Sequence, residues 1–162
     1  MNEAKFTVKE NVLTVERTFN APIKLVWRAW TEAELLDQWW APTPWKSETA
    51  KMDFSEGGSR LYAMVGPEGE KHWGLTEFTS IKPVTHFSGQ DVFCDENGEP
   101  NREMPVAKFS NDFNENNNQT TVIMVTHYAS ADDLKTVIEM GMKEGLTMAL
   151  NQLEDILLTQ KV

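Results

Sequence analysis

The side chains that could carry out chemistry in this sequence are few and scattered. The three histidines, His72, His86 and His127, stand alone, without the paired His or Cys spacing of a metal site. A metal ion needs three or four converging ligands, so we expect neither a metal ion nor a cofactor. The only cysteine, Cys94, ends a predicted strand, and we interpret it as a small buried hydrophobic residue rather than a nucleophile.

Glu77 is the most informative acidic residue. It lies in the predicted strand 73–81, where strict alternation places it on the same face as Trp73, Leu75 and Ile81. A carboxylate that points from such a face into an apolar cavity would have a raised pKa and could act as a general acid or base. Two alternatives remain open: an Arg or Lys partner for the carboxylate, or a bulge that turns the side chain outward.

The aromatic residues suggest a different kind of site. The sequence contains six Trp, eight Phe and eight Met, a composition that suits an apolar ligand pocket. Trp39 and Trp40 end a short predicted helix, and adjacent helical side chains diverge by about 100°, so both cannot enter one core. We expect one of them at a rim or opening, while core packing and pocket lining both remain open for the pair.

The elements that must position these residues follow from periodicity and turn signals. Strand-forming residues occupy 6–19, and an apolar stripe predicts a short helix over 23–30. A capping-box pattern at Thr31 and Glu34 predicts a second short helix, which ends at Trp39. About six strands with tight turns follow between residues 45 and 129, and they indicate an antiparallel meander. The fold class is therefore α+β.

One long helix is predicted at the end of the chain. Ser130 and Asp133 form an N-cap pattern, and the residues from 133 to 160 include no Pro. A continuous helical face runs through Leu134, Ile138, Met142, Gly145, Ala149, Leu153 and Ile156. Gly141 and Gly145 would weaken this helix by about 1–2 kcal/mol together. Tight packing against the sheet or a ligand in the groove would explain them, and we favour tight packing.

These motifs, in this order, resemble those of the START-like superfamily, and more narrowly the family of activator of heat-shock protein 90 ATPase homologues. The matching residues span about 12–160 and include Ala21-Pro22, Val26-Trp27, Trp30-Thr31, Leu36, Trp39-Trp40, Asp53, Gly57-Gly58, Met64–Gly69, Trp73-Gly74, Glu77, Ile81-Lys82-Pro83, Glu144-Gly145 and Leu153. The resemblance implies a helix-grip fold, in which a curved antiparallel sheet wraps around the C-terminal helix and leaves a cavity. We expect residues 1–162 to form one such domain.

The net charge of the chain indicates which classes of binding partner are disfavoured. The net charge of −10 disfavours nucleic acid and anionic lipid, and no apolar run is long enough to cross a membrane. The single cysteine and the lack of a secretory signal at the N-terminus lead us to expect a cytoplasmic location.

The leading functional hypothesis is the binding of a small hydrophobic or aromatic molecule between the sheet and the C-terminal helix. The candidate ligand-binding residues are Trp39, Trp40, Tyr62, Met64, Trp73, Glu77, Phe93, Met142, Gly145 and Ala149. One alternative is a co-chaperone-like module whose acidic surface meets a protein partner such as a chaperone ATPase. The other is an enzyme that resembles cyclases or hydrolases of the superfamily and uses Glu77 as its acid or base, or a histidine as its base.

Overall fold

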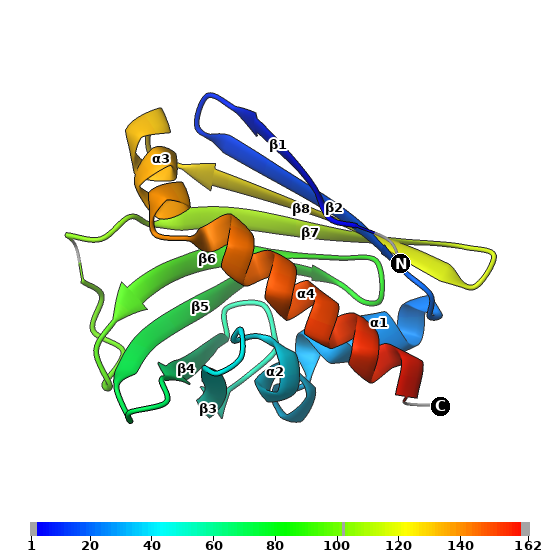
Figure 1. Ribbon diagram of the computed structural model, residues 1–162, viewed down its shortest axis with the longest axis horizontal. Coiled ribbons are helices and arrows are strands. Elements are labelled where there is room, and N and C mark those ends of the chain that lie inside the picture. The colour runs from blue at the N-terminus through cyan, green and yellow to red at the C-terminus, as the bar shows by residue number, and fades with distance from the viewer. Residues whose placement is uncertain (1–2, 102, 160–162) are drawn as a thin grey trace.

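An eight-stranded antiparallel sheet forms the centre of the fold (Figure 1), as the computed structural model shows for residues 3–101 and 103–159. Its strands are β1 Lys5–Lys9, β2 Val12–Phe19, β3 Lys46–Met52, β4 Ser59–Val65, β5 Lys71–Lys82, β6 His86–Cys94, β7 Ala107–Asn116 and β8 Gln119–Tyr128. Their order in the sheet is β1-β2-β8-β7-β6-β5-β4-β3. The expected meander of six strands is therefore confirmed for β3 to β8, and the β1–β2 hairpin joins it beside β8.

Four helices complete the fold in the part of the chain that the structure describes. The helices α1 (Ile23–Thr31) and α2 (Ala33–Trp39) connect β2 to β3, and α3 (Ala131–Glu139) and α4 (Met142–Thr159) follow β8. Figure 1 shows α4 crossing the sheet diagonally, with α1 and α2 beside its C-terminal half. The α+β architecture with a curved sheet around the C-terminal helix agrees with the expectation from the sequence. None of the described helices combines the length and the apolar character needed to cross a membrane.

The prediction of one continuous helix at the end of the chain is wrong, because the helix is interrupted between α3 and α4. Gly141 has a φ of 91°, a left-handed conformation that ends a helix and that glycine adopts without steric cost. The periodic apolar face continues from Ile138 to Met142 across this break, so periodicity alone did not reveal it. The predicted cap at the start of α3 is present, since the Ser130 hydroxyl accepts a hydrogen bond from the Asp133 amide at 3.1 Å.

The predicted capping box at the start of the second short helix is absent. Thr31 is the last residue of α1, and its hydroxyl donates to the Trp27 carbonyl at 2.9 Å. Glu32 occupies the N-cap position of α2 without a side-chain cap. The two helices are nevertheless separate, as expected, because Glu32 has extended backbone geometry between them.

The core lies between the concave face of the sheet and the helices. Along β2, burial alternates, with Val15, Arg17 and Phe19 buried and Glu16 exposed, as expected for a strand with one covered face. Arg17 enters this core as a charged residue and pairs with Glu154 of α4 at 2.6 Å. This buried ion pair fixes α4 on the sheet near the end of the helix away from α3, so that the opposite end borders the candidate site.

Candidate functional site

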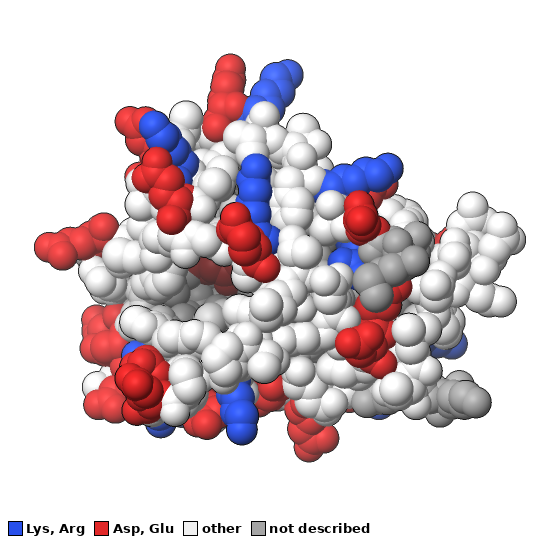
Figure 2. All heavy atoms as spheres, viewed as in Figure 1, with Lys and Arg blue, Asp and Glu red and all other residues white. Residues whose placement is uncertain are grey.

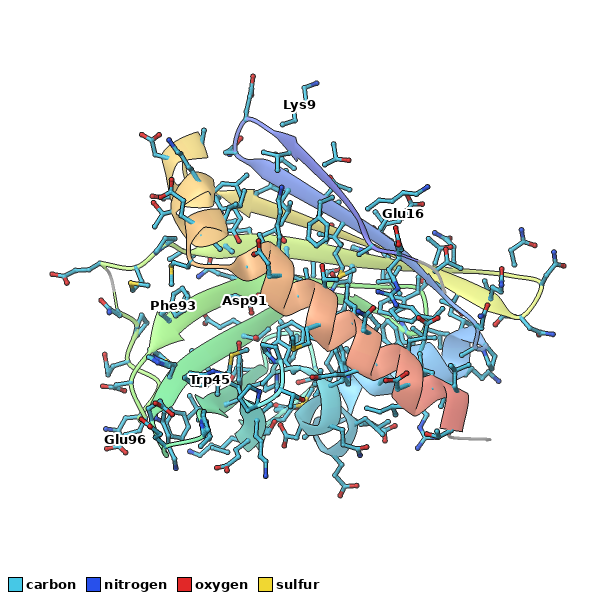
Figure 3. All side chains as sticks on the ribbon, in the orientation of Figure 1. Lys9, Glu16, Trp45, Asp91, Phe93 and Glu96 are labelled. Atoms are coloured by element: carbon cyan, nitrogen blue, oxygen red, sulfur yellow. The ribbon has the colours of Figure 1, made fainter. Side chains whose placement is uncertain are left out.

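A cavity of about 460 Å³ lies between the sheet and the N-terminal half of α4. Its walls come from β2, from β4 to β8, and from the four helices, and most of the lining side chains are apolar or aromatic. Exposed residues of the lining, Phe93 and Met140, mark the opening to solvent. Figure 2 shows this face hollowed, with acidic atoms visible inside the hollow, and Figure 3 places Asp91 at the matching position beside α4.

One row of residues crosses the sheet along the floor of the cavity. In the register of the strands, Arg60 of β4 pairs with Thr76 of β5, which pairs with Asp91 of β6. The row continues through Ala107 of β7 to Tyr128 of β8. Directly paired residues lie on the same face of an antiparallel sheet, so the row presents its polar groups to one side. Arg60, Thr76, Asp91 and Tyr128 all line the cavity.

Asp91 is the acidic residue of this site. Its carboxylate accepts a hydrogen bond from the Thr76 hydroxyl at 2.6 Å. Burial among apolar groups raises the pKa of Asp91 to about 6, although the Thr76 hydrogen bond and the Arg60 charge both favour the ionised form. No Lys, Arg or His forms an ion pair with Asp91 within the described residues. The site therefore contains a carboxyl group that changes its charge near neutral pH.

The positive charge of Arg60 is already engaged by other groups. Its guanidinium pairs with Asp37 at 3.2 Å and donates to the hydroxyl oxygens of Ser47 and Thr49 at 2.9 and 3.0 Å. Asp37 in turn accepts from Ser47 and Thr49, so that α2 is joined to β3 and β4. Burial lowers the pKa of Arg60, while Tyr62 and Asp37 act in the opposite direction. This network positions the wall of the cavity formed by α2.

Two tyrosines lie near Asp91: Tyr128 ends its row on β8, and Tyr62 lies in the neighbouring row on β4. The Tyr62 ring lies 4.1 Å from the Arg60 guanidinium and over Gly74, where an added Cβ would come within 2.8 Å of the ring. A side chain at position 74 would therefore displace Tyr62 from the cavity wall. Burial, and then the negative charge of Asp91, raise the pKa of both Tyr62 and Tyr128 to about 12. Both phenols are thus uncharged hydrogen-bonding groups at neutral pH.

Most of the residues proposed from the sequence lie at this cavity. Its lining includes Trp39, Trp40, Tyr62, Met64, Trp73, Phe93, Met142 and Gly145. Trp39 is fully buried in the core and donates to the Ala29 carbonyl at 2.9 Å, whereas Trp40 is only half-buried. Trp73 also borders the cavity, although it lies on the face of β5 opposite to the one that carries Thr76. Its ring lies 5.9 Å from the Lys71 ammonium. Ala149 does not line the cavity, because it packs in the core between α4 and the sheet.

Glu77 does not belong to the site. Its side chain is exposed and lies on the outer face of β5, opposite Gln90. The register shifts between Phe78 and Ser80, so strict alternation cannot be carried from Ile81 back to Glu77. Ile81 packs against the core, and Glu77 therefore points the other way. The bulge considered for this strand is present, and it excludes Glu77 as an acid or base in the cavity.

The carboxyl group of the cavity is Asp91, which the sequence analysis did not select. A signal for it was present in the alternation of β6, where Phe87, Gly89, Asp91 and Phe93 share one face. An acidic residue between aromatic residues on the same face of a strand indicates a carboxylate that points inward. Arg60 and Thr76 were also missed, because only the strand register brings them beside Asp91.

Gly145 borders open space rather than tightly packed neighbours. Outside the adjacent turns of its own helix, a Cβ at this position would have one atom of the described residues within 4 Å, Pro42 Cγ at 3.7 Å, which is an ordinary contact. The favoured explanation of tight packing against the sheet is therefore wrong. The missing side chain instead enlarges the cavity beside α4.

The cysteine and the histidines are not arranged as a metal site. In residues 3–101 and 103–159, no three His, Cys, Asp or Glu residues are grouped to bind a metal ion. Cys94 lies at the end of β6 opposite Trp73, and burial, followed by the nearby Asp95 charge, raises the pKa of its thiol. A raised pKa disfavours the thiolate that a nucleophile needs. His86 Nδ1 lies 2.8 Å from Asp112 Oδ1, at hydrogen-bonding distance.

The sheet, the C-terminal helix that it surrounds and the cavity between them define a START-like protein. Residues 20–158 match the model of the family described as Activator of Hsp90 ATPase homolog 1-like protein, and the chain belongs to this family. No curated protein matches the sequence significantly.

Solved structures of bacterial proteins have the same fold. Protein Ms6760 from Mycobacterium smegmatis is 32% identical, with a TM-score of 0.87 and coverage of 99% of this chain and 98% of that chain. A protein from Arthrobacter aurescens is 29% identical, with a TM-score of 0.89 and coverage of 98% and 92%. A protein from Staphylococcus epidermidis is 28% identical, with a TM-score of 0.86 and coverage of 98% and 96%.

Proposed function

We propose that this protein binds a small hydrophobic or aromatic molecule in the cavity between the sheet and α4. The observation that carries the proposal is the cavity itself, with about 460 Å³ and a lining in which apolar and aromatic side chains predominate. Small-molecule sites in proteins have volumes of roughly 300–1,000 Å³ and combine apolar walls with a few polar groups. The polar groups of this lining are few, and they include the row from Arg60 through Thr76 and Asp91 to Tyr128.

A fluorescence titration with N-phenyl-1-naphthylamine, an uncharged hydrophobic probe, tests this proposal. The informative variant is Gly145→Leu, because its side chain would extend past Pro42 into the cavity. Met148→Leu is the matched control on the same helix, since Met148 is exposed and outside the cavity lining. We expect Gly145→Leu to weaken probe binding at least tenfold while its melting temperature holds or rises, and Met148→Leu to bind like the parent protein.

Equal probe affinity in all three proteins would place binding outside the cavity and contradict the proposal. Native mass spectrometry of freshly purified protein provides an independent measurement, because a bound molecule adds its mass to that of the chain.

Acid–base chemistry is the second candidate, and it now depends on Asp91 instead of Glu77. A carboxyl group whose pKa of about 6 lies near neutral pH, and that faces a cavity, has the properties of a general acid or base. The experiment is to incubate the protein with the molecule recovered by mass spectrometry and to follow any change in its mass. Turnover that disappears in Asp91→Asn would favour the enzyme, and binding without turnover would favour a binding protein.

A co-chaperone-like role is the third candidate. The family description refers to activation of a chaperone ATPase, and the net charge of −10 would suit a basic partner surface. This role predicts that the protein stimulates the ATPase of a chaperone. If Gly145→Leu still stimulates the chaperone ATPase, the co-chaperone role does not depend on ligand binding in the cavity.

A further inference from the structure

The polar groups of the cavity do not balance in charge. Among residues 3–101 and 103–159, the charged or ionisable groups in its lining are Arg60, His72, Asp91 and the two phenols Tyr62 and Tyr128. Both phenols are uncharged at neutral pH, and His72 is an exposed residue whose ring lies 5.5 Å from that of Trp45. The segments of α3 and α4 that line the cavity contribute no charged side chain. The balance therefore depends on Arg60, its partner Asp37 and Asp91.

The Arg60 charge is neutralised without Asp91. Its guanidinium is bound by Asp37, Ser47 and Thr49. Arg60 lies on β4 and Asp91 on β6, with Thr76 of β5 between them in the same row. Adjacent strands are about 4.8 Å apart, so the Cα atoms of positions 60 and 91 are roughly 10 Å apart. One guanidinium and two carboxylates leave a net negative charge when Asp91 is ionised. This charge lies on the wall of a cavity that is mostly apolar.

Aromatic rings surround the position that a ligand on Asp91 would occupy. Tyr62 and Phe93 lie in the neighbouring row on one side, and Phe109 and Tyr128 lie on β7 and β8 beyond Asp91. The faces of aromatic rings carry partial negative charge and attract cations, most strongly where water is excluded. A carboxylate among aromatic rings is therefore complementary to a cation on an apolar molecule, and the acidic surface raises the local concentration of such molecules.

We propose that the ligand of this cavity is an aromatic or otherwise apolar amine whose protonated nitrogen forms an ion pair with Asp91. The inference rests on the proposed binding function and adds the chemical class of the ligand. The ammonium group donates to the carboxylate oxygens, one of which also accepts from Thr76. The apolar part of the molecule extends toward α4, where Met142, Gly145 and Leu146 line the cavity.

Three probes with the same ring system test the proposal: 1-naphthylmethylamine as the cation, 1-naphthalenemethanol as the neutral molecule and 1-naphthoate as the anion. Isothermal titration calorimetry at pH 8 measures the affinity of each for the parent protein, for Asp91→Asn and for Glu77→Gln. Glu77→Gln is the matched control, because it removes the same charge from the exposed outer face. The readout is the ratio of the affinities for the amine and the alcohol.

We expect a ratio of at least ten in the parent protein, or about 1.4 kcal/mol, and a similar ratio in Glu77→Gln. In Asp91→Asn the ratio should fall to about one. In the parent protein a ratio of ten at pH 8 should also fall to about two at pH 5, where a carboxyl group with a pKa of about 6 is about nine-tenths protonated. This second measurement tests the proposal even if Asp91→Asn fails to fold.

Four results would overturn the proposal. A ratio near one in the parent protein, with the alcohol bound, would reject the amine while the proposed binding function stands. A preference for the naphthoate would identify Arg60 as the anchor instead of Asp91. A preference for the amine that persists in Asp91→Asn and at pH 5 would place the ion pair elsewhere. If none of the three probes bound, the proposed function would fail together with the inference.

Discussion

Replacement of Asp91 by Asn should stabilise the free protein at neutral and alkaline pH. The folded protein holds the Asp91 carboxyl among apolar groups, and none of the described cations forms an ion pair with it, so ionisation is harder in the folded state than in the unfolded chain. The amide introduced by the substitution would be uncharged at every pH and would retain the Oδ1 acceptor for the Thr76 hydroxyl. The substitution therefore removes the cost of burying a charge and keeps the hydrogen bond.

The magnitude follows from the pKa. Burial raises the pKa of Asp91 from 3.8 to about 6, and each unit corresponds to about 1.4 kcal/mol. A raised carboxyl pKa means that the folded state binds the proton more tightly, so the stability from this group is present below pH 4. It is lost as the pH rises from about 4 to about 6. The free energy of unfolding of Asp91→Asn should thus exceed that of the parent protein by roughly 3 kcal/mol above pH 7. Near pH 4 the two free energies should be about equal.

Urea denaturation followed by tryptophan fluorescence at half-unit steps from pH 4 to pH 8 measures this difference. Glu77→Gln is the control, because it makes the same chemical change at an exposed position of the same sheet and should stay within about 0.5 kcal/mol of the parent protein. If the free energies of unfolding of Asp91→Asn and the parent protein differ by the same amount at every pH, the reasoning is refuted. A loss of stability at pH 8 would also refute it, because it would mean that Asp91 forms a favourable ion pair.

Two further predictions concern the C-terminal helices. Gly141→Ala should destabilise the protein by about 1–2 kcal/mol because position 141 is left-handed, whereas Gly145→Ala should stabilise it by about 0.5–1 kcal/mol because position 145 is helical with space for a methyl group. The same denaturation assay measures both, and stabilisation by both would indicate one unbroken helix. Glu154→Ala should cost about 3–5 kcal/mol by leaving the buried Arg17 without its partner, and a loss below about 1 kcal/mol would show that this pair does not hold α4.

The large features of the fold were predictable because many residues contribute to each of them. The strand-forming residues at 6–19 and the turn signals of the meander depend on local sequence, so they indicated the strands directly. The break at Gly141 was not predictable in this way, since Ile138 and Met142 keep helical spacing across it. A glycine within a periodic face is compatible both with a weakened helix and with a helix end.

The cavity between the sheet and the C-terminal helix was predictable, but its acidic residue was not. An acidic group on an apolar face was expected at Glu77, and the structure places it at Asp91 on the neighbouring strand. A single extra residue between Phe78 and Ser80 reverses the faces of β5, and its presence depends on pairing with β6 rather than on the sequence of β5 alone. The Asp37–Arg60 pair likewise joins residues of α2 and β4 that only the tertiary fold brings together.

The methionine methyl groups offer the most direct test of ligand binding in the cavity. Met64, Met124, Met140 and Met142 line it, whereas Met148 is exposed on α4 outside it. A nuclear magnetic resonance titration of protein labelled at these methyl groups with 1-naphthalenemethanol follows both sets of signals in one experiment. The account predicts saturable shifts of the four cavity methyl signals and an unchanged Met148 signal. Shifts of Met148 alone, or no shift of the cavity signals at saturating probe, would contradict it.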